Sequence, residues 1–347
     1  MNPRVKPQLR LAFVGCGGIA QSHWQGIQHH ASRVQVTAVI DSHPEQARQM
    51  AALTGAPPFD CLEAALAADD FDAVDIMLPH HLHEEVALQA FAAGKHVLLE
   101  KPMSTTLDSC DRILAAAEAA GTVFMVAEQA EYWPDAVAIR QLIGAGALGE
   151  LVTASALFGG NTPVPLGSTP RPWRYDLKAA GGGITIDGGA HWIRPLRMWL
   201  GEIDEVLATV GHPVAEMEGE SLARALFRFQ SGVVAGFAAM SAGFEVGPKE
   251  EFRITGTLGE IVVYWGGSGR VVFFDRQTPQ GRDLPPDLLP HGKNREAAFG
   301  LELDDFCHAV LEGRSLAAGP EVSLGELRTG LAMYRSAQTR NWEKVWA

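Results

Sequence analysis

The chain has 347 residues, enough for about two domains, and its 47% apolar and 20% charged residues are typical of a folded globular protein. This composition excludes an intrinsically disordered chain and a collagen-like repeat. The 41 acidic side chains outnumber the 28 basic ones and give a net charge of −13, which argues against nucleic acid or an anionic membrane as a partner.

Neither a secretory leader nor a membrane-spanning segment is expected. The apolar run at residues 11–14 is too short for a signal peptide and leads into a glycine turn, and no stretch approaches the roughly 18 apolar residues of a membrane span. The four cysteines are scattered and form no CxxC pair. We therefore expect reduced thiols in a cytoplasmic protein.

The first third of the chain alternates short apolar runs with alanine-rich stretches of helical length. Apolar runs without alternation predict strands buried on both faces, as in a parallel sheet covered by helices. The expected strands are residues 11–14, 34–40, 73–78, 96–99 and 123–126, and the expected helices are residues 19–31, 44–54, 61–68, 83–93 and 106–120. Repeated βαβ units predict an α/β, doubly wound parallel sheet, which we place at residues 1–127.

The rest of the chain, residues 128–347, has a different pattern and predicts a second, α+β domain. A helix at 136–143 is followed by β-type runs separated by turn residues, which indicates a large open, mainly antiparallel sheet. These runs are residues 152–158, 206–210, 222–229, 233–240, 252–255, 261–264 and 271–274. Helices are expected near 184–200, 297–312 and 322–342, with a surface loop at 276–295, and the last helix is a candidate to pack back on the first domain.

The strand expected at residues 233–240 is apolar on both faces. An exposed apolar sheet face rarely stays uncovered. We therefore expect a homodimer or homotetramer that forms through the second-domain sheet.

A glycine-rich turn follows the first strand and has the G-x-G-x-x-A pattern of a dinucleotide-binding turn. It reads Gly15-Cys16-Gly17-Gly18-Ile19-Ala20. Gly15 permits the tight turn, Gly17 lets a pyrophosphate approach the backbone, and Ala20 allows close packing of the helix on the strand. A tight turn without a ligand is the alternative.

The second expected strand ends in Asp41. A carboxylate at this position accepts hydrogen bonds from the ribose hydroxyls of NAD and repels the 2′-phosphate of NADP. We expect NAD as the cofactor, with NADP as the less favoured alternative.

Two further strands end in polar residues, and in open α/β sheets ligands bind beyond the carboxyl ends of the strands. The third run leads into Pro79-His80-His81-Leu82-His83. No cysteine or acid stands at metal-ligand spacing beside these histidines, so we expect no metal there. We assign Pro79, His80 and His83 to helix capping and cofactor contacts.

The fourth run leads into Glu100-Lys101-Pro102. Pro102 favours an extended Lys101, and the bond between them is a candidate for the cis isomer. Two interpretations remain open for the lysine. Its ammonium either pairs with Glu100 or lies beside a nicotinamide, where it holds or deprotonates a substrate hydroxyl.

Asp187 and His191 stand four residues apart, so on a helix they share one face. Gly188, Gly189 and Pro195 are poor interior helix residues and predict an irregular or kinked helix. A purely structural Asp–His hydrogen bond is the alternative to a catalytic pair.

Together these motifs resemble the glucose–fructose oxidoreductase/inositol dehydrogenase (Gfo/Idh/MocA) family. The matching features, in family order, are the glycine turn, Asp41, Pro79 with His83, Glu100-Lys101-Pro102, the turn at 144–149, and Gly181-Gly182-Gly183 followed by Asp187 and His191. The resemblance implies a Rossmann domain, an α/β domain with an open antiparallel sheet, NAD(P) as cofactor, and a sugar or cyclitol substrate. It also implies that Lys101, Asp187 and His191 form the catalytic group, with Glu100 and Lys101 at the cofactor.

In this scheme His191 is the general base, Lys101 holds the substrate oxygen, and Asp187 orients a neighbouring hydroxyl. The polar loop at residues 160–176 adds candidate substrate contacts at Trp173, Arg174 and Tyr175, although packing at a domain or subunit interface would also explain it.

Arg194 stands where the family often has an aspartate. An additional arginine near the site favours an acidic or keto-acid substrate. Three functions remain open: an NAD-dependent sugar or cyclitol dehydrogenase, an enzyme that uses transient oxidation for elimination or glycoside cleavage, and a non-catalytic NAD-linked sensor.

Overall fold

The computed structural model describes residues 7–161, 171–242, 250–264, 270–289 and 295–347. The chain forms two compact units. The first comprises Met1–Tyr132 and Glu296–Ser323, and the second comprises Trp133–Arg295 and Leu324–Ala347. Each unit is therefore built from two separate pieces of sequence, whereas the sequence analysis placed a single boundary after residue 127.

Among the described residues, six strands form the sheet of the first unit in the order β3-β2-β1-β4-β5-β6. All of the observed pairings are parallel. The strands are β1 (Leu9–Val14), β2 (Val34–Ile40), β3 (Pro58–Phe59), β4 (Ala73–Ile76), β5 (His96–Glu100) and β6 (Phe124–Ala127). The order reverses between β1 and β4, which confirms the expected doubly wound sheet. β3 was not expected, because two residues are too few to show a hydrophobic period.

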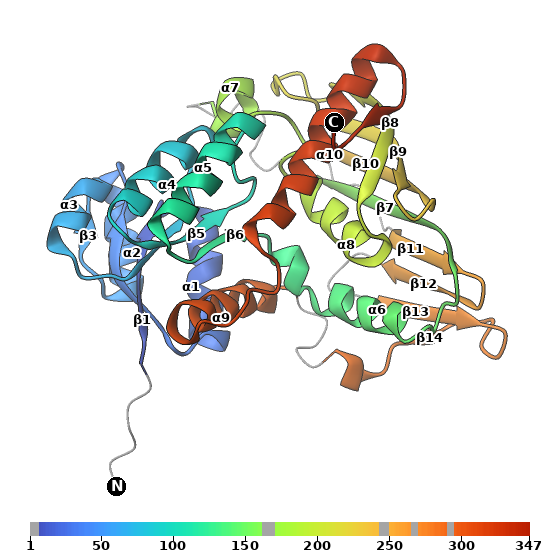
Figure 1. Cartoon of the computed structure of the whole chain (residues 1–347), viewed down its shortest axis with the longest axis horizontal. Helices are drawn as coiled ribbons and strands as arrows, with labels where there is room; N and C mark the ends of the chain where they lie inside the picture. The colour runs from blue at the N-terminus through green and yellow to red at the C-terminus, as the bar shows by residue number, and fades with distance from the viewer. Residues whose placement is uncertain (1–6, 162–170, 243–249, 265–269, 290–294) are drawn as a thin grey trace, which may run out of the picture. The chain divides into compact units, whose positions relative to one another are not determined.

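Helices cover both faces of this sheet (Figure 1). They are α1 (Gly18–His30), α2 (Pro44–Thr54), α3 (Leu62–Ala68), α4 (His83–Ala92) and α5 (Leu107–Ala120), with short 3-10 helices η1 (His80–Leu82) and η2 (Gln129–Tyr132). A helix from late in the chain, α9 (Ala297–Glu312), also belongs to this unit and packs against α1.

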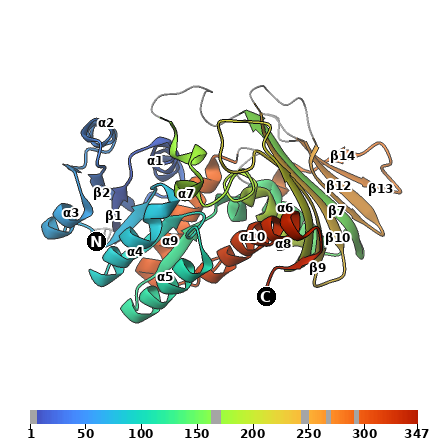
Figure 2. The same ribbon diagram turned by 90° about the horizontal axis from the view of Figure 1, so that it is seen from above.

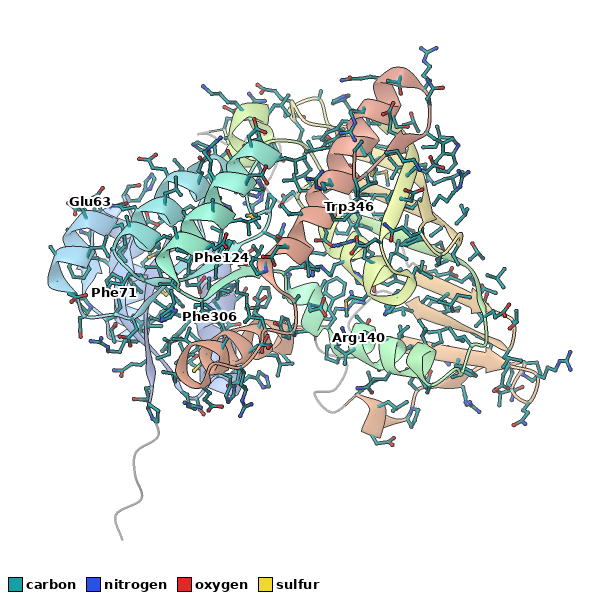
Figure 3. The ribbon with its side chains drawn as sticks, viewed as in Figure 1. Glu63, Phe71, Phe124, Arg140, Phe306 and Trp346 are labelled. Carbon is teal, nitrogen blue, oxygen red and sulfur yellow. The ribbon has the colours of Figure 1, made fainter. Side chains whose placement is uncertain are left out.

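Two glycines allow α1 and α9 to touch. A side chain at Gly26 would begin 2.6 Å from the backbone nitrogen of Gly300. Phe306, labelled in Figure 3, extends from α9 into the same core as Leu11 and Phe13 of β1.

Nine strands form the sheet of the second unit within the described residues, in the order β14-β13-β12-β11-β7-β10-β9-β8-β15. They are β7 (Leu151–Asn161), β8 (Ile203–Gly211), β9 (Leu222–Phe229), β10 (Val234–Ala242), β11 (Glu250–Gly256), β12 (Gly259–Tyr264), β13 (Arg270–Asp275), β14 (Arg282–Asp283) and β15 (Glu343–Lys344). β7 and β10 pair in parallel and the other observed pairs are antiparallel. The expected mainly antiparallel sheet is confirmed.

One face of this sheet is covered by α6 (Pro134–Gly144), α8 (Ala190–Leu200) and α10 (Leu324–Thr339) (Figure 2). Shorter helices in this unit are η3 (Trp173–Tyr175), α7 (Leu177–Ala180) and η4 (Pro286–Leu288), whereas η5 (Pro320–Ser323) ends the first unit. The segment expected at 322–342 as a helix packing on the first domain is α10, and it belongs to the second unit. There it lies on β8, where the Ala208 amide donates to the Ser336 hydroxyl at 2.9 Å.

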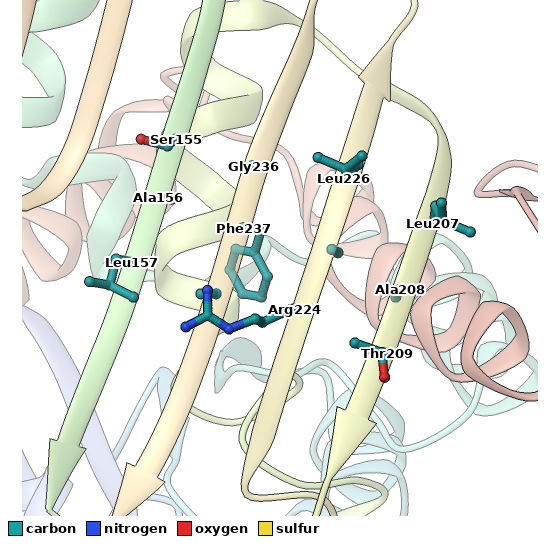
Figure 4. Close-up of a pocket in the computed structure, with 12 residues that line it drawn as sticks. Ser155, Ala156, Leu157, Leu207, Ala208, Thr209, Arg224, Leu226, Gly236 and Phe237 are labelled. Carbon is teal, nitrogen blue, oxygen red and sulfur yellow. The ribbon is translucent and has the colours of Figure 1, made fainter. Parts of the chain in front are cut away.

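The opposite face of the sheet carries a shallow hollow of about 640 Å³ across β7, β8, β9 and β10 (Figure 4). Leu226 on this face is 44% exposed. Side chains on this face alternate with buried ones along β9, as expected for a strand with one covered face. No helix in the described part of the chain is long and apolar enough to cross a membrane.

Candidate active site

The glycine turn after β1 has the shape that a dinucleotide requires. Gly15 has φ +96°, and a side chain there would begin 2.4 Å from the carbonyl oxygen of Met77. Gly17 precedes α1, and a side chain there would meet nothing within 4 Å. No described side chain caps the first amides of α1, and Gly18 is exposed. These free N–H groups at a helix N-terminus fit a pyrophosphate.

The next two residues of the turn fasten α1 to the sheet. Ile19 is partly exposed, whereas Ala20 is fully buried in the core of the first unit. A larger side chain at Ala20 would push the helix away from the sheet.

Asp41 joins the end of β2 to this turn. One carboxylate oxygen accepts a hydrogen bond from the Cys16 amide at 2.9 Å, and the other accepts one from the His43 amide at 2.8 Å. Oδ1 also lies 3.3 Å from Nδ1 of His43, so Oδ2 is the oxygen that keeps a second lone pair for a ribose hydroxyl. Burial and the charge of Asp41 raise the pKa of the Cys16 thiol to about 12, so this cysteine stays protonated.

The polar segments after β4 and β5 are tied together by His83. Its ring is fully buried, with Nδ1 2.9 Å from the Pro102 carbonyl oxygen and Nε2 2.9 Å from the Leu78 carbonyl oxygen. Burial lowers the pKa of His83, whereas the two carbonyl contacts oppose this effect. His80 is buried beside it, and Pro79 is the N-cap residue that precedes η1. The described residues contain no cluster of three or more side chains able to hold a metal.

Lys101 follows β5 directly and is partly exposed, and the Lys101–Pro102 peptide bond is cis. Its backbone amide lies 3.2 Å from the Ala127 carbonyl oxygen and 3.1 Å from Oε2 of Glu100. Glu100 itself is buried, and its Oε1 lies 3.1 Å from Nε2 of His23. The Ala127 carbonyl and the Glu100 carboxylate therefore together hold the backbone of Lys101.

In the second unit a glycine-rich loop precedes α8. Glu220 is buried beneath this loop, where its carboxylate accepts hydrogen bonds from the amides of Gly183 at 3.0 Å and Thr185 at 2.8 Å. A side chain at Gly188 would begin 2.7 Å from the Phe158 ring, which explains the glycine. The loop is thus held by a buried carboxylate and by close packing.

Asp187 and His191 do not share one helix, contrary to the expectation from their spacing. α8 begins at Ala190, so only His191 is helical, and Asp187 lies in the preceding turns. Gly188 and Gly189 separate the two residues and favour turns over helix. His191 is partly exposed, with its ring centroid 6.3 Å from that of Trp133.

Of the three candidate substrate residues in the polar loop, two lie beside Asp187. The Nε–H group of Arg174 donates to Oδ2 of Asp187 at 3.1 Å, and the same guanidinium lies 4.3 Å over the Trp173 ring. Both charged side chains are partly exposed. Residues 162–170 of the same loop lie outside the described residues.

Two residues expected near the substrate are instead structural. Tyr175 is 2% exposed and packs with Val214 and Met217. Arg194 is also 2% exposed, and its Nη2 donates to Glu326 of α10 at 2.8 Å. Its place on the covered side of α8 makes it a buried ion-pair residue, so Arg194 gives no support for an acidic substrate.

The sequence analysis also missed four buried polar residues that support the site, namely His23, Asp75, Glu220 and Glu302. Asp75 interrupts the apolar strand β4, and Glu302 lies on the core-facing side of α9. A charged residue within a buried element is the signal that would have identified both.

Comparison with known proteins agrees with this architecture. Residues 9–128 match the family model described as "Oxidoreductase family, NAD-binding Rossmann fold", and residues 136–262 match the "GFO/IDH/MocA C-terminal domain".

Similar proteins with assigned activities include 1,5-anhydro-D-fructose reductase of Ensifer adhaerens, which is 28% identical over 95% of this chain and 96% of its own. D-xylose 1-dehydrogenase (NADP(+)) 2 of Haloferax volcanii is 27% identical over 89% and 91%. Among solved structures, the WlbA dehydrogenase of Bordetella pertussis in complex with NADH and UDP-GlcNAcA has a TM-score of 0.86 at 23% identity, covering 99% of both chains. Levoglucosan dehydrogenase in complex with NADH and levoglucosan has the same TM-score, 0.86, at 22% identity, covering 97% and 99%. These structures share the fold of this chain.

Proposed function

Because this chain belongs to the GFO/IDH/MocA family of NAD(P)-dependent oxidoreductases, we propose that it transfers a hydride between a nicotinamide and a secondary alcohol or ketone of a sugar, cyclitol or sugar derivative. The observation that carries this proposal is the Glu100-Lys101-Pro102 segment. It places a partly exposed lysine at the carboxyl end of β5, in the same unit as a glycine turn that fits a pyrophosphate.

The nicotinamide, when bound, accepts or supplies the hydride. The chain's own residues bind the substrate's oxygen and transfer its proton. In the oxidation direction His191 accepts the hydroxyl proton, and in reduction it returns that proton. The Lys101 ammonium donates a hydrogen bond to the same oxygen and stabilises the negative charge that develops there.

Asp187 orients the substrate by accepting a hydrogen bond from a neighbouring hydroxyl. Arg174 supports this role because its guanidinium is bonded to Asp187 and stacked on Trp173. The Trp173 ring is also a candidate surface for the apolar face of a sugar ring. A sugar substrate agrees with the activities of the similar reductase of Ensifer adhaerens and dehydrogenase of Haloferax volcanii.

We also propose that NAD is preferred over NADP. Asp41 supports this preference, because its carboxylate lies at the end of β2, beside the glycine turn, and would repel a 2′-phosphate. A homodimer or homotetramer through the second-domain sheet is proposed as well, since Leu226 and the hollow around it form an exposed face on an otherwise covered sheet.

The test is a panel of sugars, cyclitols and glycosides with NAD+ and NADP+, read at the NADH absorbance band and by product analysis. Lys101→Ala and His191→Ala should each lose most of kcat and keep the affinity for NAD+. The matched controls are the exposed residues in Lys178→Ala and His29→Ala, which should behave as wild type. Near-normal kcat in either site variant would overturn the role assigned to that residue. A changed product without accumulating NADH would instead identify the transient-oxidation enzyme.

A further inference from the structure

A buried cluster of ionisable side chains lies behind Glu100 and takes no part in the chemistry proposed above. Its centre is His23 of α1, which is fully buried. Nδ1 of His23 lies 2.7 Å from Oδ2 of Asp75 on β4, and Nε2 lies 3.1 Å from Oε1 of Glu100 on β5. Oε1 of Glu302 on α9 is 3.7 Å from the same Nε2.

The two ring nitrogens of His23 therefore both face carboxylate oxygens. A neutral imidazole carries one N–H group, so one of these contacts would set two lone pairs against each other. An imidazolium satisfies both contacts. Burial alone lowers the pKa of His23, but the charges and hydrogen bonds of Asp75 and Glu100 outweigh it and hold the pKa well above its usual value.

Glu302 complements this arrangement by carrying a proton. Both of its oxygens are buried without a hydrogen-bond partner among the described residues. Burial, reinforced by the charges of Glu100 and Glu128, raises the pKa of Glu302 well above its usual value despite the opposing effect of His23. The cluster thus places an imidazolium against the carboxyl groups of Asp75 and Glu100, with a neutral acid as its fourth member. Burial raises the pKa of Asp75 as well, against the opposing charge of His23.

Glu100 connects this cluster to Lys101. One oxygen of its carboxylate faces His23 and the other faces the backbone amide of Lys101 at 3.1 Å. The same amide also donates to the Ala127 carbonyl oxygen at 3.2 Å, so Glu100 is one of its two acceptors. Rotating the Glu100 carboxylate to keep one contact would break the other, so His23 determines how this acceptor is oriented.

We propose that His23 is a positioning residue that acts on Lys101 through the carboxylate of Glu100. The inference rests on the proposed catalytic role of Lys101, but the contact itself can be tested without catalysis. His23 touches neither cofactor nor substrate in this scheme, because its side chain is fully buried.

The first test uses the full chain labelled with ¹⁵N-histidine. The His23 signals are identified among the 12 histidines by their loss in His23→Gln. Both ring nitrogens should carry protons from about pH 6 to about pH 8, where an ordinary histidine loses one. An unprotonated ring nitrogen of His23 at neutral pH would contradict the proposal that His23 is an imidazolium.

The second test follows hydrogen exchange of the Lys101 amide. Exchange should be about twofold faster or more in His23→Gln, because Glu100, one of the two acceptors of this amide, no longer has a fixed orientation. Asp75→Asn keeps the shape of the cluster while removing one charge, and it should act in the same direction if His23→Gln folds poorly. His29→Gln, on the exposed side of the same helix, is the control and should change nothing. Unchanged exchange in both cluster variants would overturn the proposal whatever the kinetics show.

The third test uses the best substrate from the panel above. His23→Gln should lower kcat about tenfold to a hundredfold and leave the NAD+ affinity within about twofold, as expected when a catalytic group is displaced by a fraction of an ångström. In a Lys101→Ala background the same substitution should cause no further loss. An equal loss in both backgrounds would show that His23 acts by another route. Full activity in Lys101→Ala alone would instead overturn the catalytic role of the lysine, leaving the exchange result to decide the contact.

Discussion

Arg174 and Asp187 form an ion pair in which the guanidinium Nε–H donates to Oδ2 of the carboxylate at 3.1 Å. The two residues come from different local structures, because Arg174 lies in η3 and Asp187 lies in the turns before α8. The pair fixes the carboxylate that we assign to substrate orientation. The charge of the arginine also reduces the net charge that a substrate meets there.

Removing this pair should weaken catalysis without unfolding the protein. In Arg174→Gln we expect kcat/KM to fall about tenfold to a hundredfold, the range of one charge-assisted hydrogen bond. The affinity for NAD+ should stay as in wild type. Arg171→Gln is the control, since Arg171 pairs with Glu218 instead. Steady-state kinetics and cofactor titration measure both quantities, and an unchanged kcat/KM would contradict the role of the pair.

Substituting alanine at two glycines of the same turn should affect different properties, the stability of the fold at Gly15 and NAD+ binding at Gly17. Gly15→Ala places a methyl group 2.4 Å from the Met77 carbonyl oxygen at φ +96°, so it should destabilise the fold by at least about 1–3 kcal/mol. Gly17→Ala meets no atom within 4 Å and should leave stability unchanged while weakening NAD+ binding. Urea unfolding and cofactor titration separate the two effects. Equal stability losses in both variants would contradict the assignment.

Asp41→Asn tests the cofactor preference. The amide keeps the shape of the carboxylate and one acceptor for the Cys16 or His43 amide, but it loses the charge that repels a 2′-phosphate. The ratio of kcat/KM for NADP+ over NAD+ should rise about tenfold, equivalent to about 1.4 kcal/mol. Asp60→Asn, at an exposed position, should leave the ratio unaltered. Equal discrimination in Asp41→Asn and wild type would refute the ribose assignment.

The open face of the second-domain sheet should be an interface between copies of this chain. Leu226→Lys places a charge on this face beside Arg224, so like charges would be buried on assembly. We expect light scattering to show a dimer or tetramer for wild type and smaller species for the variant. Leu53→Lys changes an exposed leucine of the first unit and should keep the wild-type mass. A monomeric wild-type protein at micromolar concentration would contradict the proposal.

The buried cluster should make stability fall as the pH rises. The pKa of Glu302 is raised by burial in the folded chain, so between its ordinary value near 4.3 and the raised value the native state binds the extra proton. Stability is then lost with increasing pH, by at most about 1.4 kcal/mol per pH unit for this one proton. His23, whose pKa is also raised in the folded chain, adds a further loss above about pH 6.5.

Glu302→Gln removes the first of these two contributions. The difference in unfolding free energy between the variant and wild type should therefore grow in favour of the variant from about pH 5 to about pH 8. Urea unfolding across this range measures it, with the exposed Glu85→Gln as the control. A difference that stays constant with pH would show that Glu302 is ionised in the native protein.

The sequence predicted the elements well where the hydrophobic period was long enough to show. β2 and α2 begin and end where they were expected. Each has a run of apolar residues long enough to recognise, and turn or cap residues mark its ends. The glycine turn was equally clear, since the positive φ of Gly15 is a property of the turn itself. β3 was missed because two residues are too few to show a hydrophobic period. The turns around Asp187 were expected as helix, because the glycines there are required by close contacts with Phe158 and Thr185 that the sequence does not show.

The amino-acid sequence by itself determined the family and the doubly wound sheet, and it supplied the candidate site residues, because these depend on local patterns and on motifs in a fixed order. Only the tertiary structure decided that Arg194 and Tyr175 are buried, that Arg174 pairs with Asp187, and that His23 contacts Glu100. Each of these depends on which face of an element is covered and on partners as far as 132 residues away in the chain. A local sequence pattern does not identify such partners, because they come close together only when the elements pack.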